Sequence, residues 1–261
     1  MKYRAFLYCI LTGGLCLHVS PVTASTVLDG GEIRFRGFVT DESPKWTWRL
    51  ASADQVWTVD TADARRTGDS LQFDLRDRGS LPFLEGHLFK VAERGGPGFS
   101  PRISFSSNGS PFTLIQGRET DQHFRASVPV INPESGQITG ALSFSVEQAL
   151  GVSLGRQDEG GDVVNGLSLA AGESVTQPQP GILSRRLMAR LSTLIHMNQG
   201  GHDMNAVSNG QTLSQSSLSG GHVMNIAAAY ASELSDFELQ LPATGTPSRW
   251  RARLSVTVTV Q

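Results

Sequence analysis

The sequence predicts an all-β protein, built as an antiparallel sandwich that carries a helix-containing insertion. Short runs of alternating apolar and polar residues recur between turn signals over 32–146 and again over 223–260. This spacing is typical of antiparallel sandwiches. The stretch between them, about 149–221, is instead polar and glycine-rich in several places. We therefore expect one β domain, residues 41–261, with an insertion at about 149–221.

The first 24 residues have the features of a secretory signal peptide. Lys2 and Arg4 precede an apolar run, Phe6–Val19, and Val22-Thr23-Ala24 forms a small-residue cleavage site. Cleavage after Ala24 would leave Ser25 as the first residue of the exported chain. Residues 25–40 would then form an extension ahead of the β domain.

Cysteine use and charge narrow the classes of function. Both cysteines, Cys9 and Cys16, lie in the signal, so the exported chain would contain no disulfide. A lipid anchor on Cys16 is the alternative to cleavage after Ala24. The full chain has a formal net charge of −2 and no block of basic residues. This argues against nucleic acid, and against an anionic membrane surface, as a partner.

The N-terminal half contains a series of short β-type runs. In Trp46–Leu50 the apolar residues Trp46, Trp48 and Leu50 alternate with polar ones, as in a half-buried strand. The two tryptophans could stack on a sugar, but their period of two with Leu50 favours core packing. The further runs are Val56–Val59, Leu71–Leu75 and Leu81–Val91.

Two turn signals predict hairpins in the middle of the chain. Asn108-Gly109 is the dipeptide that most favours a tight two-residue turn. Pro133-Glu134-Ser135-Gly136 combines residues that favour a turn by separate mechanisms. The strands flanking these turns are Ile103–Phe105 with Phe112–Leu114, and Phe124–Ile131 with Ile138–Val146.

A helix is expected inside the insertion. Ser184 is a good N-cap for a helix that ends near Met197. Its apolar residues fall on one face, which we interpret as a packing face: Leu187, Leu191, Leu194 and Ile195.

A short, imperfect sequence repeat follows the helix. Gly200–Asn205 resembles Gly220–Asn225, and with His196 these segments place three histidines in a glycine-rich region. Imidazole is a common ligand of transition metals, so a metal site is one interpretation. The other, which we favour, is a turn used twice or a chance match in a biased composition.

No motif of enzyme chemistry is present. The histidines beyond the signal fall in no metalloprotease motif, and the chain has no G-x-S-x-G elbow and no phosphate-binding loop. We therefore expect no catalytic residue, no metal and no cofactor, and keep a β-type hydrolase as the alternative class. The histidines in question are His87, His123, His196, His202 and His222.

A strongly alternating run occurs in the predicted extension, and another occurs at the end of the predicted β domain. Near the start, Ile33, Phe35, Gly37 and Val39 share one face. Glycine is costly inside a strand unless another group must approach closely. This segment is either the first strand of the domain's own sheet or a strand donated to a neighbouring subunit. At the other end, one face of the last strand carries Leu254, Val256, Val258 and Val260.

Several segments together resemble a known family. Ile33–Val39 is similar to the N-terminal extensions of chaperone–usher pilins, in which alternating apolar residues surround a glycine. Pro44–Arg49, Ala227–Ala231 and Ser248–Val256 resemble the Fae-type (K-eighty-eight-like) fimbrial subunits of enteric bacteria. The arginine-rich approach to the last strand looks more like the minor subunits than the major adhesin. The C-terminal Val260-Gln261 lacks the aromatic residue that many pilins carry there.

The resemblance implies a fold and a set of partners. It implies an incomplete immunoglobulin-like sandwich that lacks its final strand. A periplasmic chaperone would lend that strand, an outer-membrane usher would assemble the fibre, and the extension of the next subunit would then replace the chaperone. In this scheme Ile33, Phe35, Gly37 and Val39 are the donor residues. Leu254, Val256, Val258 and Val260 line the groove and pair with the chaperone strand.

The sequence thus predicts a non-enzymatic structural subunit of an adhesive cell-surface fimbrium, exported through the periplasm. The alternative is a fimbrial adhesin that binds host glycans through the insertion. The resemblance assigns no ligand-binding residue, because the insertion does not align residue by residue.

Overall fold

The structure is a computed structural model, and it describes residues 44–52, 54–99, 101–155 and 166–260. The predicted signal peptide and the donor residues Ile33, Phe35, Gly37 and Val39 lie outside the described residues.

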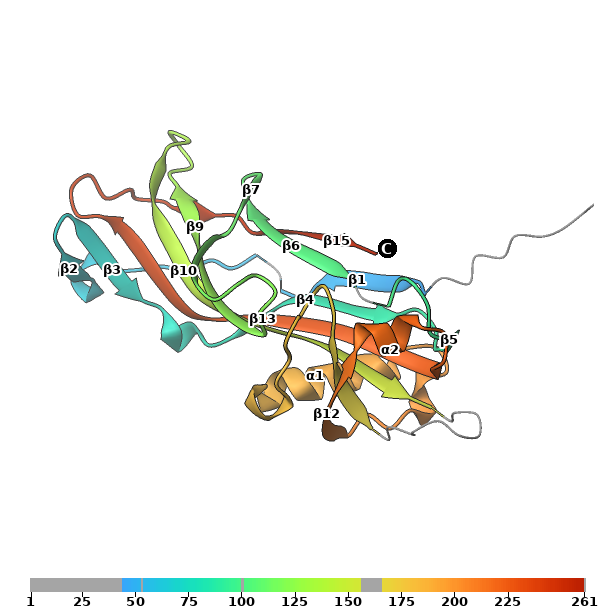
Figure 1. Ribbon diagram of the computed structural model, residues 1–261. Coiled ribbons are helices and arrows are strands. Elements are labelled where there is room, and N and C mark those ends of the chain that lie inside the picture. The colour runs from blue at the N-terminus through green and yellow to red at the C-terminus, as the bar shows by residue number, and fades with distance from the viewer. Residues whose placement is uncertain (1–43, 53, 100, 156–165, 261) are drawn as a thin grey trace, which may run out of the picture. The chain divides into compact units, whose positions relative to one another are not determined.

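The described chain consists mainly of strands, with two α-helices and short 3-10 turns (Figure 1). The strands are β1 (Trp46–Leu50), β2 (Arg65–Thr67), β3 (Ser70–Asp74), β4 (Leu81–Leu88), β5 (Ala92–Arg94), β6 (Arg102–Ser107), β7 (Ser110–Pro111), β8 (Thr113–Gln116), β9 (His123–Ile131), β10 (Ile138–Leu154), β11 (Leu167–Ala171), β12 (Ser208–Ser214), β13 (Met224–Pro242), β14 (Arg251–Ala252) and β15 (Ser255–Thr259). The helices are α1 (Arg185–His196) and α2 (Gln215–Ser219), with 3-10 turns η1 (Thr61–Asp63), η2 (Arg76–Arg78), η3 (Pro180–Ile182) and η4 (Gly201–Asp203).

The strands form two sheets, as predicted for an all-β sandwich. The large sheet has the central order β1-β4-β13-β10-β11-β12, with shorter strands attached, and the small sheet has the order β15-β6-β7. Between the described strands every pairing is antiparallel except that of β11 with β12, which is parallel, and an isolated parallel bridge joins Lys90 to Gln199.

Two long strands, β10 and β13, form the backbone of the large sheet. They pair from Ala141↔Gln240 to Leu154↔Ile226. The sequence predicts two separate runs, Val223–Tyr230 and Phe237–Leu241, but β13 is one strand across both. Its pairing with β10 continues through the intervening residues, with a shift near Ser143 and a positive φ at Asp236. β10 likewise continues past Ala149 to Leu154.

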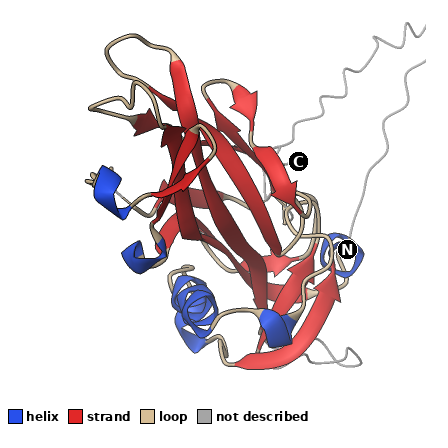
Figure 2. Cartoon of the chain, turned by 90° about the vertical axis from the view of Figure 1, so that its left-hand side faces the viewer, coloured by secondary structure: helices blue, strands red, loops and turns tan. Residues whose placement is uncertain are grey.

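Side chains of β13 alternate between two hydrophobic cores. Ile226, Ala228 and Tyr230 pack into the larger core, which the small sheet helps to cover. Ala227, Ala229 and Ala231 pack into a second core, which α1 covers from the other face (Figure 2). The small alanine side chains leave room for the helix. Because both faces of this strand are covered, it is buried along most of its length.

Helix α1 confirms the predicted helix. The hydroxyl of Ser184 accepts a hydrogen bond from the backbone N–H of Leu187 at 3.2 Å, which is the expected N-cap. The predicted packing face is buried: Leu187, Leu191, Leu194 and Ile195. In the part of the chain that the structure describes, no helix has the length and apolar character needed to cross a membrane.

Both predicted turns are present, but the first joins β6 to β7 and not to a strand at Phe112–Leu114, because Thr113 and Leu114 belong to β8, which pairs with β9. Asn108 and Gly109 have φ values of 50° and 81°, as a primed two-residue turn requires, and join β6 to β7. β9 and β10 pair at Ile131↔Ile138 on either side of the Pro133–Gly136 turn.

One predicted strand, Val56–Val59, is wrong. This segment has no strand structure, and Val56 is 92% exposed. Its residues suit a strand, but a strand needs a partner along its edge. No backbone hydrogen bond joins Val56, Trp57 or Val59 to another described residue. Trp57 is held instead by its side chain, edge-on to Phe237 with ring centroids 4.8 Å apart.

Candidate functional site

Two strands near opposite ends of the described chain each have one unpaired edge. β15 pairs with β6 from Ser255↔Ser106 to Thr259↔Arg102 and has no second neighbour among the described residues. β1 pairs with β4 from Trp46↔Leu88 to Leu50↔Leu84 and likewise has no second described neighbour. An unpaired edge presents free N–H and C=O groups, which can bind another strand.

The side chains of β15 form one apolar and one polar face. Leu254, Val256 and Val258 are half-buried and pack against the larger core. Val260, the fourth predicted groove residue, is 40% exposed and lies outside that packed set. The structure therefore brings three of the four predicted residues together, with Val256 and Val258 on the inner face of β15 and Leu254 directly before it. Their half-burial leaves apolar area that a further strand could cover.

A groove lies between the segment after β1 and the segment before β15. We call it the edge groove. It encloses about 810 Å³ and is lined by residues 56–61 on one side and 246–251 on the other, with Phe73, Leu241 and Pro133 completing the wall. Two half-buried tryptophans, Trp57 and Trp250, take part in the lining. In Figure 1 the first segment runs from β1 towards β2, and the second returns from the end of β13 towards β15.

The tryptophans of β1 pack as the sequence predicts. Trp46 stacks on Trp48 with ring centroids 5.1 Å apart, and both rings contact the larger core. Trp48 lies directly over Gly86 of β4, where a Cβ would come within 2.4 Å of the indole. The indole N–H of Trp46 donates to the carbonyl of Gly98 at 2.8 Å. These contacts fix β1 on its paired side, and its other edge has no neighbour among the described strands.

A buried carboxylate ties α1 to the paired side of β1, and sequence reasoning missed it. Glu85 of β4 is 3% exposed and accepts hydrogen bonds from Arg49 of β1 and Arg190 of α1. Burial alone would raise the pKa of Glu85, but the two guanidinium groups hold it below its ordinary value. The ion pairs therefore connect three elements that are distant in the sequence.

A second carboxylate cluster lies at the start of α1. Glu147 of β10 and Glu233 of β13 lie directly opposite each other on adjacent, paired strands. Glu147 accepts hydrogen bonds from His123 at 2.8 Å and from the backbone N–H of Ser184 at 2.7 Å, and these lower its pKa against the effect of burial. Burial and the charge of Glu147 raise the pKa of Glu233. The two carboxyl groups thus differ in acidity, with the pKa of Glu147 below and that of Glu233 above the ordinary value.

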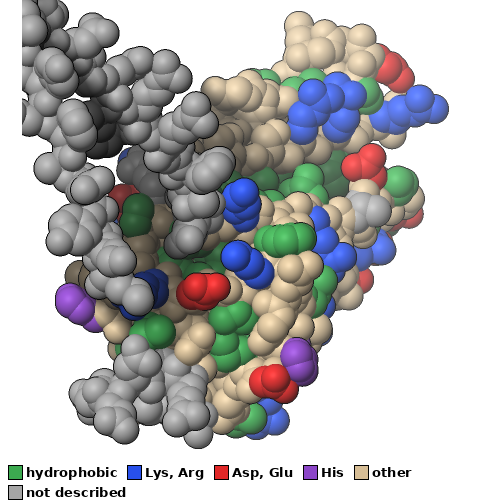
Figure 3. Space-filling view, turned by 90° about the vertical axis from the view of Figure 1, so that its right-hand side faces the viewer, with side chains coloured by type: hydrophobic (Ala, Val, Ile, Leu, Met, Phe, Trp, Pro, Cys, Tyr) green, Lys and Arg blue, Asp and Glu red, His purple; other side chains and the backbone are tan. Residues whose placement is uncertain are grey.

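The imperfect sequence repeat does not form one repeated turn. In the first copy the left-handed residue is Gly200, at the first position, whereas the second copy has two, Gly221 at the second position and Asn225 at the last. His196 bonds the carbonyl of Met204, and exposed His202 contacts Asp203. On the face shown in Figure 3 the histidines are dispersed. Within the described ranges, no three His, Cys, Asp or Glu side chains converge as a metal site would require.

Comparison with known families identifies the chain. The model of a K88-type family described as "Fimbrial, major and minor subunit" matches residues 4–261. No curated protein matches the chain. The match covers nearly the whole sequence, including both strands with an unpaired edge and the edge groove between their flanking segments. The chain therefore belongs to the family of fimbrial major and minor subunits.

Proposed function

We propose that this chain is a structural fimbrial subunit whose unpaired strand edges accept a strand from a neighbouring subunit. The unpaired edge of β15, beside the edge groove, carries this proposal. In this proposal the fold is an immunoglobulin-like sandwich that lacks one strand. The missing strand lies along β15 and extends into the edge groove.

The energetics favour a complementary strand. Exposed backbone groups on the edge of β15 would gain hydrogen bonds, and the half-buried Leu254, Val256 and Val258 would lose their contact with water. Left open, the same edge is an aggregation hazard. The proposed donor is the N-terminal extension of another subunit, with Ile33, Phe35, Gly37 and Val39 facing the core.

The partners follow from the same proposal. During export through the periplasm, a chaperone lends the strand to Leu254, Val256, Val258 and Val260, and an outer-membrane usher exchanges it for the next subunit's extension. The finished product is a cell-surface fimbrium. We place this chain among the minor subunits, because its arginine-rich approach to β15 resembles theirs.

The direct test is complementation in one chain. A copy of Glu32–Thr40 is appended to Gln261 of the full chain through a flexible linker, and size-exclusion chromatography and thermal unfolding are compared with the unmodified chain. We expect the appended strand to give a soluble monomer with a higher melting temperature. The matched control carries Phe35→Asp in the appended copy, which places a charge on the core face and should abolish the gain. A chain that is already a stable monomer without its extension and without a chaperone has a complete sandwich and contradicts the proposal.

The donor face can be tested separately. Gly37→Leu in the native extension adds a large side chain to the face that would enter the groove of another subunit. We expect the chaperone complex of this variant to form normally and its incorporation into fibres to fail. Normal incorporation would contradict the proposed donor face.

The alternative function, binding of host glycans by the predicted insertion, has one supporting observation. A cleft of about 440 Å³ lies between α1 and the sheet, and its lining includes Arg49, Arg186 and Arg190. A glycan array with the complemented chain tests this function. Binding that is lost on Arg186→Ala would support the alternative, and an array without binding would count against it.

A further inference from the structure

Three arginines alternate along the approach to the last strand. Arg249, Arg251 and Arg253 are exposed, whereas the residues between them and after them, Trp250, Ala252 and Leu254, are half-buried. None of the three guanidinium groups makes an ion pair or a hydrogen bond with a described residue. Arg249 and Arg251 also line the edge groove. We call the three residues the arginine row.

The arginine row directly precedes β15 in the sequence and includes Arg251 of β14. β14 pairs on one side with β9, at Arg251↔Ile131 and Ala252↔Val130, and β15 pairs on one side with β6. A strand added to the other edge of β15 and extended along β14 would therefore pass the arginine row. Three like charges spaced two residues apart repel one another, and an acidic partner relieves that repulsion.

Strand parity identifies which donor residues would meet the arginines. Directly opposite residues of paired strands point to the same side of a sheet. If Ile33 and its odd-numbered companions face the core, even-numbered donor residues face outward. They then lie opposite the odd-numbered residues of the acceptor, which include the whole arginine row.

The antiparallel direction gives a matched charge pattern. When Phe35 lies opposite Val256 or Val258, Glu42 falls opposite Arg249 or Arg251. In the same two registers Arg34 and Arg36 fall opposite Ser255, Thr257 or Thr259 and meet no arginine. A slip that moves the donor two residues the other way places Arg36 opposite Arg253, where like charges repel.

We propose that the arginine row selects the direction and register of the incoming strand by pairing with Glu42 of a second copy of this chain. This inference rests on the proposed function. Glu42 comes just before Pro44 and β1, so in a chain of subunits it would lie at the junction between one domain and the next. The arginine row is thus a specificity-determining surface for the partner subunit, beyond the apolar face that drives insertion.

The experiment uses the full chain with an appended copy of residues 29–43. A Gly/Ser linker of about 20 residues is long enough to allow either strand direction and still keeps the appended strand at a high effective concentration. Three variants are compared: Glu42→Lys in the appended copy, Arg249→Glu with Arg251→Glu, and all of these together. The readout is the melting temperature at low salt and at about 1 M NaCl.

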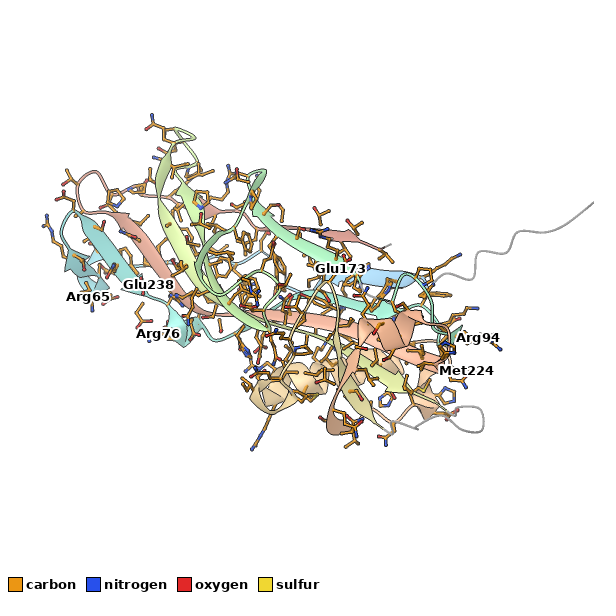
Figure 4. All side chains as sticks on the ribbon, viewed as in Figure 1. Arg65, Arg76, Arg94, Glu173, Met224 and Glu238 are labelled. Atoms are coloured by element: carbon orange, nitrogen blue, oxygen red, sulfur yellow. The ribbon has the colours of Figure 1, made fainter. Side chains whose placement is uncertain are left out.

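We expect each charge reversal alone to lower the melting temperature by about 1–4 °C at low salt, as for an exposed ion pair in a chain of this size. The combined variant should recover most of that loss, and high salt should remove the differences. Arg94→Glu is the matched control, because Arg94 is also exposed but lies on β5, outside the arginine row and outside the lining of the edge groove. Figure 4 shows Arg94 at the end of the domain away from Arg65 and Arg76. It should leave the gain from the appended strand unchanged.

Each contrary result has one meaning. An appended strand that gives no stabilisation in any variant overturns the proposed function itself. Stabilisation that is the same in all charge variants overturns only the role of the arginine row. In the parallel direction, with Phe35 opposite Leu254 or Val256, Glu32 and not Glu42 would lie opposite Arg251 or Arg253. Rescue of the arginine reversals by Glu32→Lys, without rescue by Glu42→Lys, would therefore overturn the proposed direction.

Discussion

β13 and β15 differ in how completely the chain covers them. β13 pairs with β10 on one side and with β4, β3 and β5 on the other, and residues 226–234 are all buried. β15 has a single neighbour among the described strands, and its inner residues are only half-buried. β15 alternates apolar and polar residues, whereas Ile226–Ala231 of β13 are all apolar. Within the described residues, therefore, β13 is paired along both edges and β15 along only one.

The largest loss of stability is expected from a substitution in the fully covered part of the large sheet. Leu150 of β10 is fully buried in the larger core and pairs with Tyr230. Leu150→Ala should lower the free energy of unfolding by about 2–5 kcal/mol, because it removes buried methyl groups and leaves a cavity. Urea unfolding of the complemented chain measures this. A loss of under about 1 kcal/mol would mean that this core is less tightly packed than the structure has it.

A smaller effect is expected at the contact between β1 and β4. Gly86→Ala forces the Trp48 indole to move, since the new Cβ would lie 2.4 Å from the ring. Overpacking of this kind costs about 1–3 kcal/mol. Thermal unfolding and tryptophan near-ultraviolet circular dichroism should both change. Gly181→Ala is the control, because a Cβ at Gly181 meets open space. An unchanged spectrum for Gly86→Ala would show that the two tryptophans do not stack on this glycine.

The comparison between the covered and the uncovered strand is most direct when a leucine next to β15 is also replaced by alanine. Leu254→Ala should cost about 1 kcal/mol in the chain alone, because the side chain is half-buried. With the appended strand the cost should rise to about 2–3 kcal/mol, as the residue becomes fully covered. Leu150→Ala should cost the same with and without that strand. Equal costs for Leu254→Ala in both forms would mean that the added strand does not cover this residue.

The smallest effect is a dependence on pH at the carboxylate pair. Since Glu233 has a raised pKa in the folded state, the unfolded state loses its proton first, near the ordinary value of 4.5. The stability that this group contributes is therefore complete below about pH 4.5 and declines as pH rises through the folded-state pKa.

Glu233→Gln should remove that decline. The difference in unfolding free energy between variant and parent should move in favour of the variant from pH 4.5 to neutrality, by about 0.2–1 kcal/mol for facing like charges. Chemical unfolding at several pH values measures it. Glu134→Gln, at an exposed turn, is the control. A difference that does not vary with pH would show that folding does not raise the pKa of Glu233.

Local signals made part of this structure predictable. The Ser184 cap, the stripe on α1 and the Asn108-Gly109 turn depend on residues a few positions apart, and the structure confirms all three. The edge groove and the ties of Glu85 depend on long-range contacts. Arg190 and Glu85 are 105 positions apart, so no local pattern could pair them.

Long-range pairing also explains why the predicted strand Val56–Val59 is absent and why two predicted runs form the single strand β13. Val56–Val59 has suitable residues but no described neighbour along its edge. β13 joins two predicted runs because β10 pairs with it throughout. Along β15 half-buried Val256 and Val258 alternate with exposed residues, as the sequence pattern predicts, and their role in binding a further strand stays a prediction. The donor role of Ile33, Phe35, Gly37 and Val39 stays a prediction, because these residues lie outside the described ranges.

The pairing of β1 with β4 has a mechanical consequence for a subunit in a fibre. Tension that enters the domain from the N-terminal side reaches it at Pro44 and Lys45, directly before β1. β1 is antiparallel to β4, and all five of its residues are in register with it. A pull along the strand axis therefore loads these contacts in shear, so they must break together instead of peeling apart one by one. The stacked pair Trp46 and Trp48 resists the same sliding motion.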